Sequence, residues 1–167
     1  MTEPAVATAE HHLAHINVAR FRRPKADPAN AEFLAALDAV NAAADGGDGL
    51  LWRFTPAEGD AEDRRLAADP HGLLNLSVWT DPEALKAFTY RDPLHRAMMR
   101  RRRDWFDRLD VTLALWWVPA GTRPTLREGL ERLARLARLG PTAEAFTFVR
   151  PFDAGGSALA APRPDAA

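Results

Sequence analysis

Four short strand-like segments alternate with helical segments along the chain, and this order constrains the fold more than any other feature. The strand-like segments combine alternating apolar positions with β-branched and aromatic residues, and they span residues 13–21, 50–54, 75–79 and 112–118. Segments with helical periodicity span residues 30–44, 80–90, 94–109 and 125–139. The order βαββαβ with additional helices predicts an α+β fold of ferredoxin-like topology, in which helices cover one face of an antiparallel sheet.

The domain is expected to extend over residues 13–152. Residues 1–12 and 153–167 are rich in small and polar residues and cannot bury enough apolar surface to order themselves, so both are expected to be disordered tails. The acidic segment 55–72 is long for a connection between two strands. It is therefore predicted to be a lid or a mobile loop.

Composition excludes several classes of function. The chain has 167 residues, no cysteine and a formal net charge of −1. Without cysteine there are no disulfides, thiolate nucleophiles or cysteine metal sites. His11 and His15 have the i, i+4 spacing of a metal pair only on a helix, but their segment enters a strand and no carboxylate completes the set, so no metal site is predicted. A near-neutral charge argues against nucleic acid or an anionic membrane as a partner. Neither a signal peptide nor a stretch of roughly 20 apolar residues is present, so we expect a cytoplasmic protein.

One face of the predicted sheet is almost wholly apolar. If helices cover the other face, this one also needs a cover, because apolar surfaces of this size usually mark an interface. A second copy of the sheet would provide the cover, so a homodimer through the sheet is predicted. The residues assigned to this face are Ile16, Val18, Leu76, Val78, Leu113 and Leu115.

The opposite face of the sheet carries polar side chains that the helices would bury. Taken singly, a buried Asn or Ser in a strand is usually a structural group whose hydrogen bonds are satisfied. Several of them beside tryptophans also fit a ligand pocket, which has mostly apolar walls and a few placed polar groups. The residues predicted to form this pocket are His15, Asn17, Asn75, Ser77, Trp79 and Trp116.

A run of four arginines, residues 100–103, lies within a segment of helical periodicity. At about 100° per residue, Arg100 and Arg103 turn outward, whereas Arg102 lies near the centre of the buried stripe, on the same side as His95. A buried arginine keeps its charge and needs a partner. The partner is either a carboxylate of the protein or an anionic or enolate oxygen of a ligand. We predict Arg102 and His95 as the candidate catalytic residues, with Phe106 as a pocket wall.

Several stretches of the sequence together resemble a known bacterial family. They are HINVARF, NLSVW, MRRRRDWF, LWWVPAGTRPT and GPTAEAFTF, and they cover most of residues 13–148. The family has no assigned function and is placed in the dimeric α+β barrel superfamily, alongside antibiotic-biosynthesis monooxygenases. The sequence departs from the family pattern at His15, where a glutamine is common, so no catalytic role is carried over to that residue.

The resemblance implies a function only at the level of the superfamily. Its members include cofactor-free monooxygenases, cyclases, isomerases and haem enzymes, and their ligands lie between sheet and helices. The expectation is a small enzyme of bacterial secondary metabolism that oxygenates, cyclises or isomerises an aromatic or polyketide-like substrate without a cofactor. Arg102 would stabilise an oxyanion and His95 would move protons. The alternatives are a haem-binding enzyme of the same fold and a non-enzymatic module for ligand binding or dimerisation.

Overall fold

A single antiparallel sheet forms the centre of the protein. The computed structural model describes residues 10–161. Strands β1 (His11–Arg20), β2 (Leu50–Arg53), β3 (Gly72–Trp79) and β4 (Leu113–Pro119) lie in the order β2-β3-β1-β4, and every neighbouring pair is antiparallel. This is the strand order of a ferredoxin-like sheet, with β1 and β3 in the middle. The predicted fold class is therefore confirmed.

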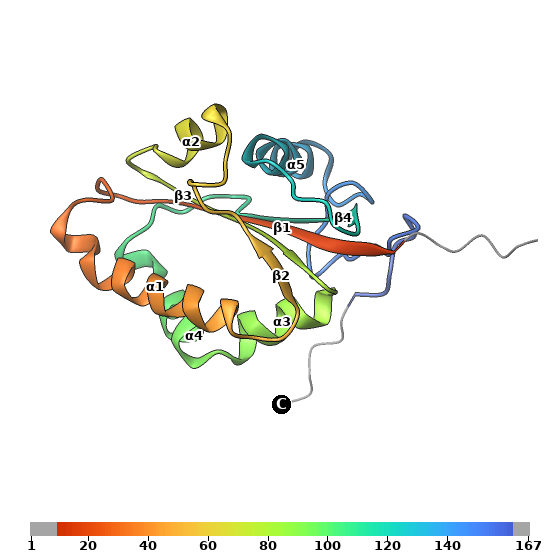
Figure 1. The fold of residues 1–167 in the computed structure, drawn as a ribbon, viewed down its shortest axis with the longest axis horizontal. Coiled ribbons are helices and arrows are strands. Elements are labelled where there is room, and N and C mark those ends of the chain that lie inside the picture. Colours follow the sequence, from red (N-terminus) through yellow and green to blue (C-terminus); the bar gives the residue numbers. More distant parts are fainter. Residues whose placement is uncertain (1–9, 162–167) are drawn as a thin grey trace, which may run out of the picture.

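Helices cover both faces of the sheet (Figure 1). On one side lie α1 (Ala31–Asp45), α3 (Pro82–Arg91) and α4 (Pro93–Arg100), and on the other lie α2 (Ala61–Ala67) and α5 (Leu126–Leu139). Two 3-10 turns, η1 (Pro28–Asn30) and η2 (Arg102–Asp104), precede α1 and follow α4. The sequence predicted helices on one face only, so the cover provided by α2 and α5 is a correction.

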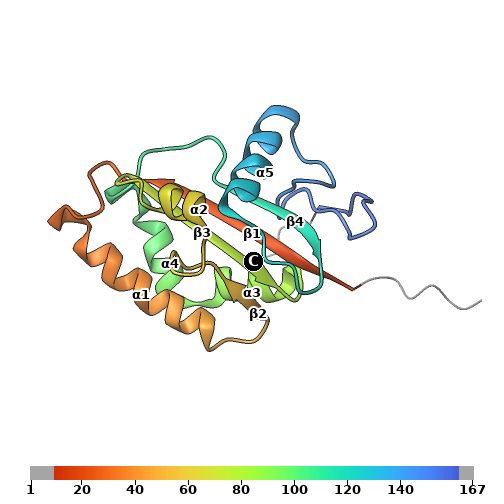
Figure 2. The ribbon, with the colours of Figure 1, turned by 45° about the horizontal axis from the view of Figure 1, so that its top comes forward.

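The main hydrophobic core lies between the sheet and α5. Ile16, Leu76 and Val78 are almost completely buried there against Leu126 and Leu133. Figure 2 shows α5 crossing the sheet over β1 and β4. The apolar surface predicted to bind a second copy is thus filled within one chain, and the reason given for a dimer through this face does not hold.

A glycine allows α5 to approach β1 closely. A Cβ placed at Gly129 would lie 2.5 Å from Cδ1 of Ile16, well inside van der Waals contact. A larger residue at this position would require the Ile16 side chain or the helix itself to shift. This close approach explains how a helix of ordinary length covers the central strand so completely.

Strand register corrects the assignment of side chains in β4. His15 pairs with Leu115, and Ile16 pairs with Ala114. Because side chains directly opposite each other lie on the same face, Leu115 belongs to the face of His15 and not to that of Ile16. Trp116, opposite Ala14, lies in the core beneath α5. Alternation within β4 gave two sets of side chains, but only the pairing with β1 decides which set faces which helices.

The segment between β2 and β3 is structured and is not a simple loop. It contains α2, which packs on α5. The Asp63 side chain is buried, and its Oδ1 accepts a hydrogen bond from the backbone N–H of Leu126 at 2.9 Å. Asp63 thereby satisfies one free donor in the first turn of α5. The prediction of a lid or mobile loop is wrong for this part of the segment.

The ends of the folded region differ from the predicted boundaries. β1 begins at His11, inside the segment assigned to the N-terminal tail. After β4 and α5, residues 153–161 form a turn, with the N–H of Leu159 bonded to the carbonyl of Pro151 at 2.8 Å. Between α5 and this turn, Phe146 forms a single isolated bridge with Leu115 of β4. The rest of both predicted tails, residues 1–9 and 162–167, lies outside the described residues.

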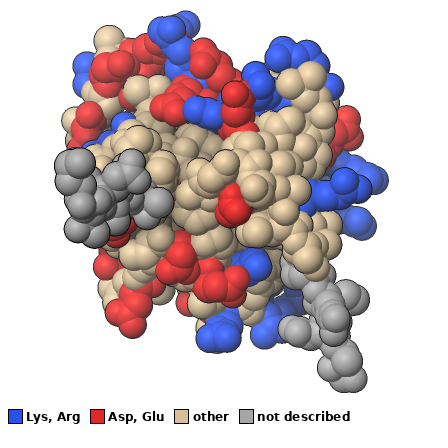
Figure 3. Space-filling model, turned by 90° about the vertical axis from the view of Figure 1, so that its right-hand side faces the viewer, with Lys and Arg blue, Asp and Glu red and all other residues tan. Residues whose placement is uncertain are grey.

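The surface near the start of β1 has a mixed charge. Figure 3 shows acidic and basic side chains around the rim of this side, with a mostly uncharged area between them that contains an acidic side chain. Within residues 10–161, each helix is too short or too polar to cross a bilayer.

Replacing Asp63 is expected to loosen the contact between α2 and α5. Asp63→Ala leaves the buried N–H of Leu126 without a partner, so the free energy of unfolding should fall by about 1–3 kcal/mol. Asp63→Asn keeps an acceptor oxygen in the same place, so its free energy of unfolding should fall by less. Urea denaturation of both variants measures this difference. An Asp63→Ala variant as stable as the wild type would mean that the hydrogen bond from Leu126 contributes nothing to stability.

Candidate functional site

A deep pocket lies between the sheet and the helices α1, α3 and α4. Its volume is about 840 Å³. Eight of the nine residues predicted to form the site line it: His15, Asn17, Asn75, Ser77, Trp79, His95, Arg102 and Phe106. The ninth, Trp116, is buried on the opposite face of the sheet and cannot contact a ligand in this pocket. The polar face of the sheet therefore lies under the helices, as the sequence indicated.

The first polar row of the pocket joins His15, Ser77 and Trp79. His15 and Ser77 are direct partners across β1 and β3, and Nδ1 of His15 lies 3.1 Å from the Ser77 hydroxyl oxygen. Trp79 lies two residues further along β3, and its Nε1 donates to the same oxygen at 2.9 Å. Since the indole can only donate, the serine oxygen accepts from Trp79, and its own proton is free to be donated to His15.

His15 is held neutral by its position. Its ring faces the pocket and not bulk solvent, and burial, together with the nearby His95, lowers its pKa to about 4. A neutral imidazole at physiological pH is a hydrogen-bond partner and a weak base. His15 is therefore suited to orient a ligand rather than to take up a proton.

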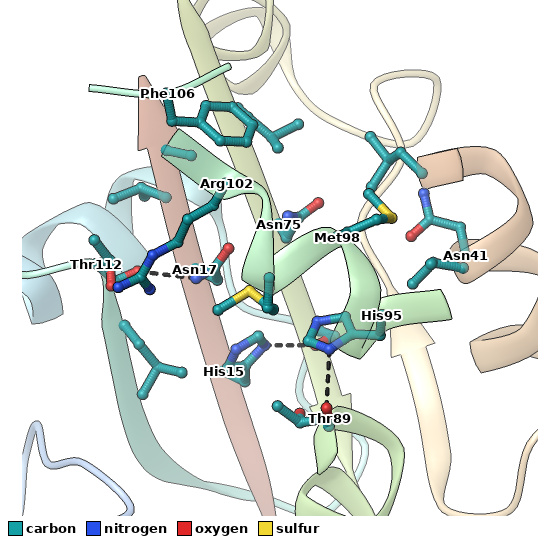
Figure 4. A pocket seen from close by; sticks show the side chains of 18 of the residues that line it. His15, Asn17, Asn41, Asn75, Thr89, His95, Met98, Arg102, Phe106 and Thr112 are labelled. Carbon is teal, nitrogen blue, oxygen red and sulfur yellow. Dashed lines mark hydrogen bonds between the residues drawn. The ribbon is translucent and has the colours of Figure 1, made fainter. Parts of the chain in front are cut away.

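His95 faces His15 from the helical wall of the pocket (Figure 4). It lies in the first turn of α4, where its backbone N–H donates to the capping residue Asp92 at 2.7 Å. Its Nδ1 lies 2.9 Å from the carbonyl oxygen of Thr89 at the end of α3. Because a carbonyl only accepts, Nδ1 carries a proton, and in the neutral ring Nε2 is left with a free lone pair. His95 thus presents a basic nitrogen whose orientation is fixed by two helices.

The second polar row of the pocket lies two residues along β1 from the first. Asn17 and Asn75 are direct partners across β1 and β3, and the Asn17 amide donates to the carbonyl of Thr112 at 3.3 Å. Figure 4 shows the Arg102 side chain reaching from the helical wall toward Asn17 and Thr112. Arg102 is solvent-exposed as a whole, but it lines the pocket, and it makes no ion pair with any carboxylate of residues 10–161.

The four arginines are unequal, but not in the way that an uninterrupted helix predicts. The α-helix ends at Arg100, and the chain tightens into the 3-10 turn η2. As a result Arg103, predicted to face outward, also lines the pocket. Arg101 is the residue that forms ion pairs, with Glu32 of α1 and with Asp104.

Tertiary packing explains why the helix stops. After η2 the chain returns to the end of β1, where Phe21 and Phe106 form an antiparallel bridge. Phe106 packs edge-on against Phe33 of α1, with ring centroids 4.8 Å apart, and Trp105 is buried beside the same ring. A helix continued past residue 101 would carry these aromatic side chains away from that cluster.

Sequence reasoning missed several lining residues on the helical side. The carbonyls of Thr89 and Thr112 give no signal in a sequence, because the backbone acceptor is common to all residues. Asn41 did give one, since it lies four residues after Leu37, at the edge of the apolar stripe of α1. Within the described residues, no group of three or more His, Asp or Glu side chains is arranged to hold a metal ion.

Comparison with known proteins identifies the family. The chain belongs to the family described as a domain of unknown function, DUF3291, whose sequence profile matches residues 12–161. This confirms the resemblance to a family without assigned function. No curated protein matches the sequence.

Three solved structures illustrate the level of structural similarity. PA3566 from Pseudomonas aeruginosa is 14% identical, with a TM-score of 0.46 over 70% of this chain and 100% of that one. Rv0793 from Mycobacterium tuberculosis is 17% identical, with a TM-score of 0.45 over 68% and 99%. SnoaB, a cofactor-independent oxygenase from Streptomyces nogalater, is 15% identical, with a TM-score of 0.43 over 69% and 97%.

The lowered pKa of His15 predicts a pH-dependent loss of stability. Between its ordinary value of 6.5 and about 4, the unfolded chain binds a proton that the folded chain does not. Stability should therefore fall as the pH falls through this window, by up to about 3 kcal/mol from this group.

Replacing His15 isolates this contribution. His15→Gln is polar but does not titrate, so its unfolding free energy should fall less between pH 7 and pH 4.5 than that of the wild type. Urea denaturation at both pH values measures the difference. Parallel pH profiles for the two proteins would show that His15 is not held neutral by the fold.

Proposed function

We propose that this protein is a small enzyme that binds an aromatic or polyketide-like substrate in the pocket and acts without a cofactor. The observation that carries the proposal is His95, whose free Nε2 faces an apolar cavity beside a neutral hydrogen-bonding histidine. A base that faces a largely apolar cavity suits proton removal from a phenol or an enolisable ketone. The phenolate or enolate so formed is the species from which oxygenation, cyclisation or isomerisation proceeds.

The proton transfer is assigned to particular atoms. The substrate O–H or C–H proton passes to Nε2 of His95, which becomes an imidazolium, and the electron pair stays on the substrate as a phenolate or enolate. The Thr89 carbonyl holds the opposite nitrogen and stabilises the charged ring through Nδ1. His15, neutral and tied to Ser77, orients the substrate oxygen. The aromatic walls formed by Trp79, Phe88 and Phe106 exclude water and hold the substrate rings.

Replacing His95 tests this assignment. His95→Gln keeps a polar side chain of similar reach but removes the base, so turnover should fall by roughly 10²–10⁴-fold while substrate binding changes little. Oxygen uptake and ultraviolet absorbance, measured with a panel of phenols, anthrones and β-polyketones, provide the assay. Turnover of His95→Gln at the wild-type rate would contradict the proposal. Tight binding across the panel without any turnover would favour a ligand-binding module.

A haem-binding function is the second candidate, because His95 could hold the iron through the ring nitrogen that is not bonded to Thr89. Metal-binding histidines commonly donate one ring N–H to a carbonyl and coordinate through the other nitrogen. The size of the pocket and its apolar walls fit a haem, and arginines without ion pairs at its rim would pair with the propionates. Bound haem would supply iron-based electron-transfer or oxygen chemistry.

Titration with hemin separates the two candidates. A haem protein should develop a Soret band with saturable binding, and His95→Gln should change its position or abolish it. No spectral change beyond that of free hemin would reject the haem function and leave the cofactor-free enzyme.

A further inference from the structure

The charge of the pocket lining differs from the charge of the chain. The protein as a whole has a formal net charge of −1. Five arginines line the pocket, Arg22, Arg53, Arg102, Arg103 and Arg108, but only two acidic residues do, Asp107 and Asp110. A local excess of one sign inside a concave site concentrates ligands of the opposite charge.

Two of the lining arginines are already engaged. Arg53 forms a two-point hydrogen bond with Asp45, and Arg22 lies 4.0 Å from Asp107. Arg102, Arg103 and Arg108 form no ion pair with carboxylates of residues 10–161. Of these three, Arg102 extends to the floor of the pocket at Asn17 and Thr112 (Figure 4). An unpaired guanidinium beside an amide is a good receptor for a carboxylate, which it can bind through two hydrogen bonds.

The two polar rows of the pocket are separated by a fixed distance. His15 and Asn17 point to the same face of β1 and are two residues apart, so the rows lie roughly 7 Å from each other along the strand. One aromatic ring with substituents at opposite ends spans this gap. The pocket therefore offers an imidazole pair at one end of such a ring and an unpaired arginine at the other.

We infer that the pocket selects ligands with a permanent anionic group at one end and a weakly acidic hydroxyl one ring-length away at the other, the anion being held by Arg102 with Asn17. This rests on the proposed function, because the hydroxyl is the group placed at His95. It goes beyond that function by naming the ligand class and by giving Arg102 a task other than oxyanion stabilisation. In this arrangement the arginine holds a charge that is present throughout the reaction, and specificity resides in the distance between the two rows.

Three one-ring probes test the inference by calorimetry or by quenching of tryptophan fluorescence. They are 4-hydroxybenzoate, its neutral isostere 4-hydroxybenzamide, and 2-hydroxybenzoate, which has the same charge with the wrong spacing. In the wild type, 4-hydroxybenzoate should bind at least about tenfold more tightly than either of the others, the scale of one charge-assisted contact. Equal affinities, or no binding of 4-hydroxybenzoate up to millimolar concentration, would overturn the inference.

Two arginine variants test whether Arg102 causes the preference for the carboxylate probe. In Arg102→Gln, the affinities for 4-hydroxybenzoate and 4-hydroxybenzamide should become nearly equal. Arg100→Gln is the matched control, because Arg100 is exposed in the same run and does not line the pocket, and it should keep the wild-type preference. If Arg102→Gln kept the wild-type preference for 4-hydroxybenzoate over the amide, Arg102 would not be the residue that binds the anion.

His95→Gln separates this inference from the proposed enzyme activity. It should keep the preference for 4-hydroxybenzoate over the amide, since the anion binds at the other row. If the wild type binds 4-hydroxybenzoate selectively but turns over no substrate, the proposed enzyme function is rejected and the inferred ligand class stands. Loss of selectivity in His95→Gln with retention in Arg102→Gln would mean that the anion is bound at the histidine row.

Discussion

The register of β1 against its two neighbours is the constraint on which the rest of the structure depends. β1 pairs with β3 on one edge and with β4 on the other, and residues 13–17 have a partner on both strands. Ile16 is thereby placed with Leu76 and Ala114 under α5, and His15 is placed with Ser77 under α4. Because side chains alternate along a strand, a slip of one residue would exchange the core and the pocket.

The two faces of the sheet differ in how closely their side chains are packed. Under α5 the side chains are apolar and completely buried, and a glycine allows the helix into close contact. Under α1, α3 and α4 the sheet carries polar groups and a cavity is left open. On this side His15 is held neutral by burial, which lowers stability at acidic pH, and Arg102 lines the cavity without an ion pair to a carboxylate of residues 10–161.

The arginine run shows how backbone geometry gives chemically identical residues different tasks. Arg100 ends an α-helix at the surface, Arg101 ties the turn to Glu32 of α1, and Arg102 reaches across the pocket. The change from α-helix to 3-10 turn alters the angle between successive side chains, so positions from a uniform helical wheel no longer apply. The aromatic cluster around Phe106 imposes this change, and it involves residues more than seventy positions away in sequence, such as Phe33.

The sequence alone determined the element order, the ferredoxin-like sheet and the polar face that carries His15, Asn17, Asn75 and Ser77, because alternation and helical periodicity are local properties of the chain. It also singled out His95 and Arg102 as pocket residues. Tertiary structure decided what depends on pairing between distant segments: that Leu115 lies with His15 and Trp116 in the core, that α5 covers the face assigned to a dimer, and that a 3-10 turn replaces the last part of a helix. Side-chain patterns within a segment fix which residues share a face, whereas only contacts between segments fix what that face meets.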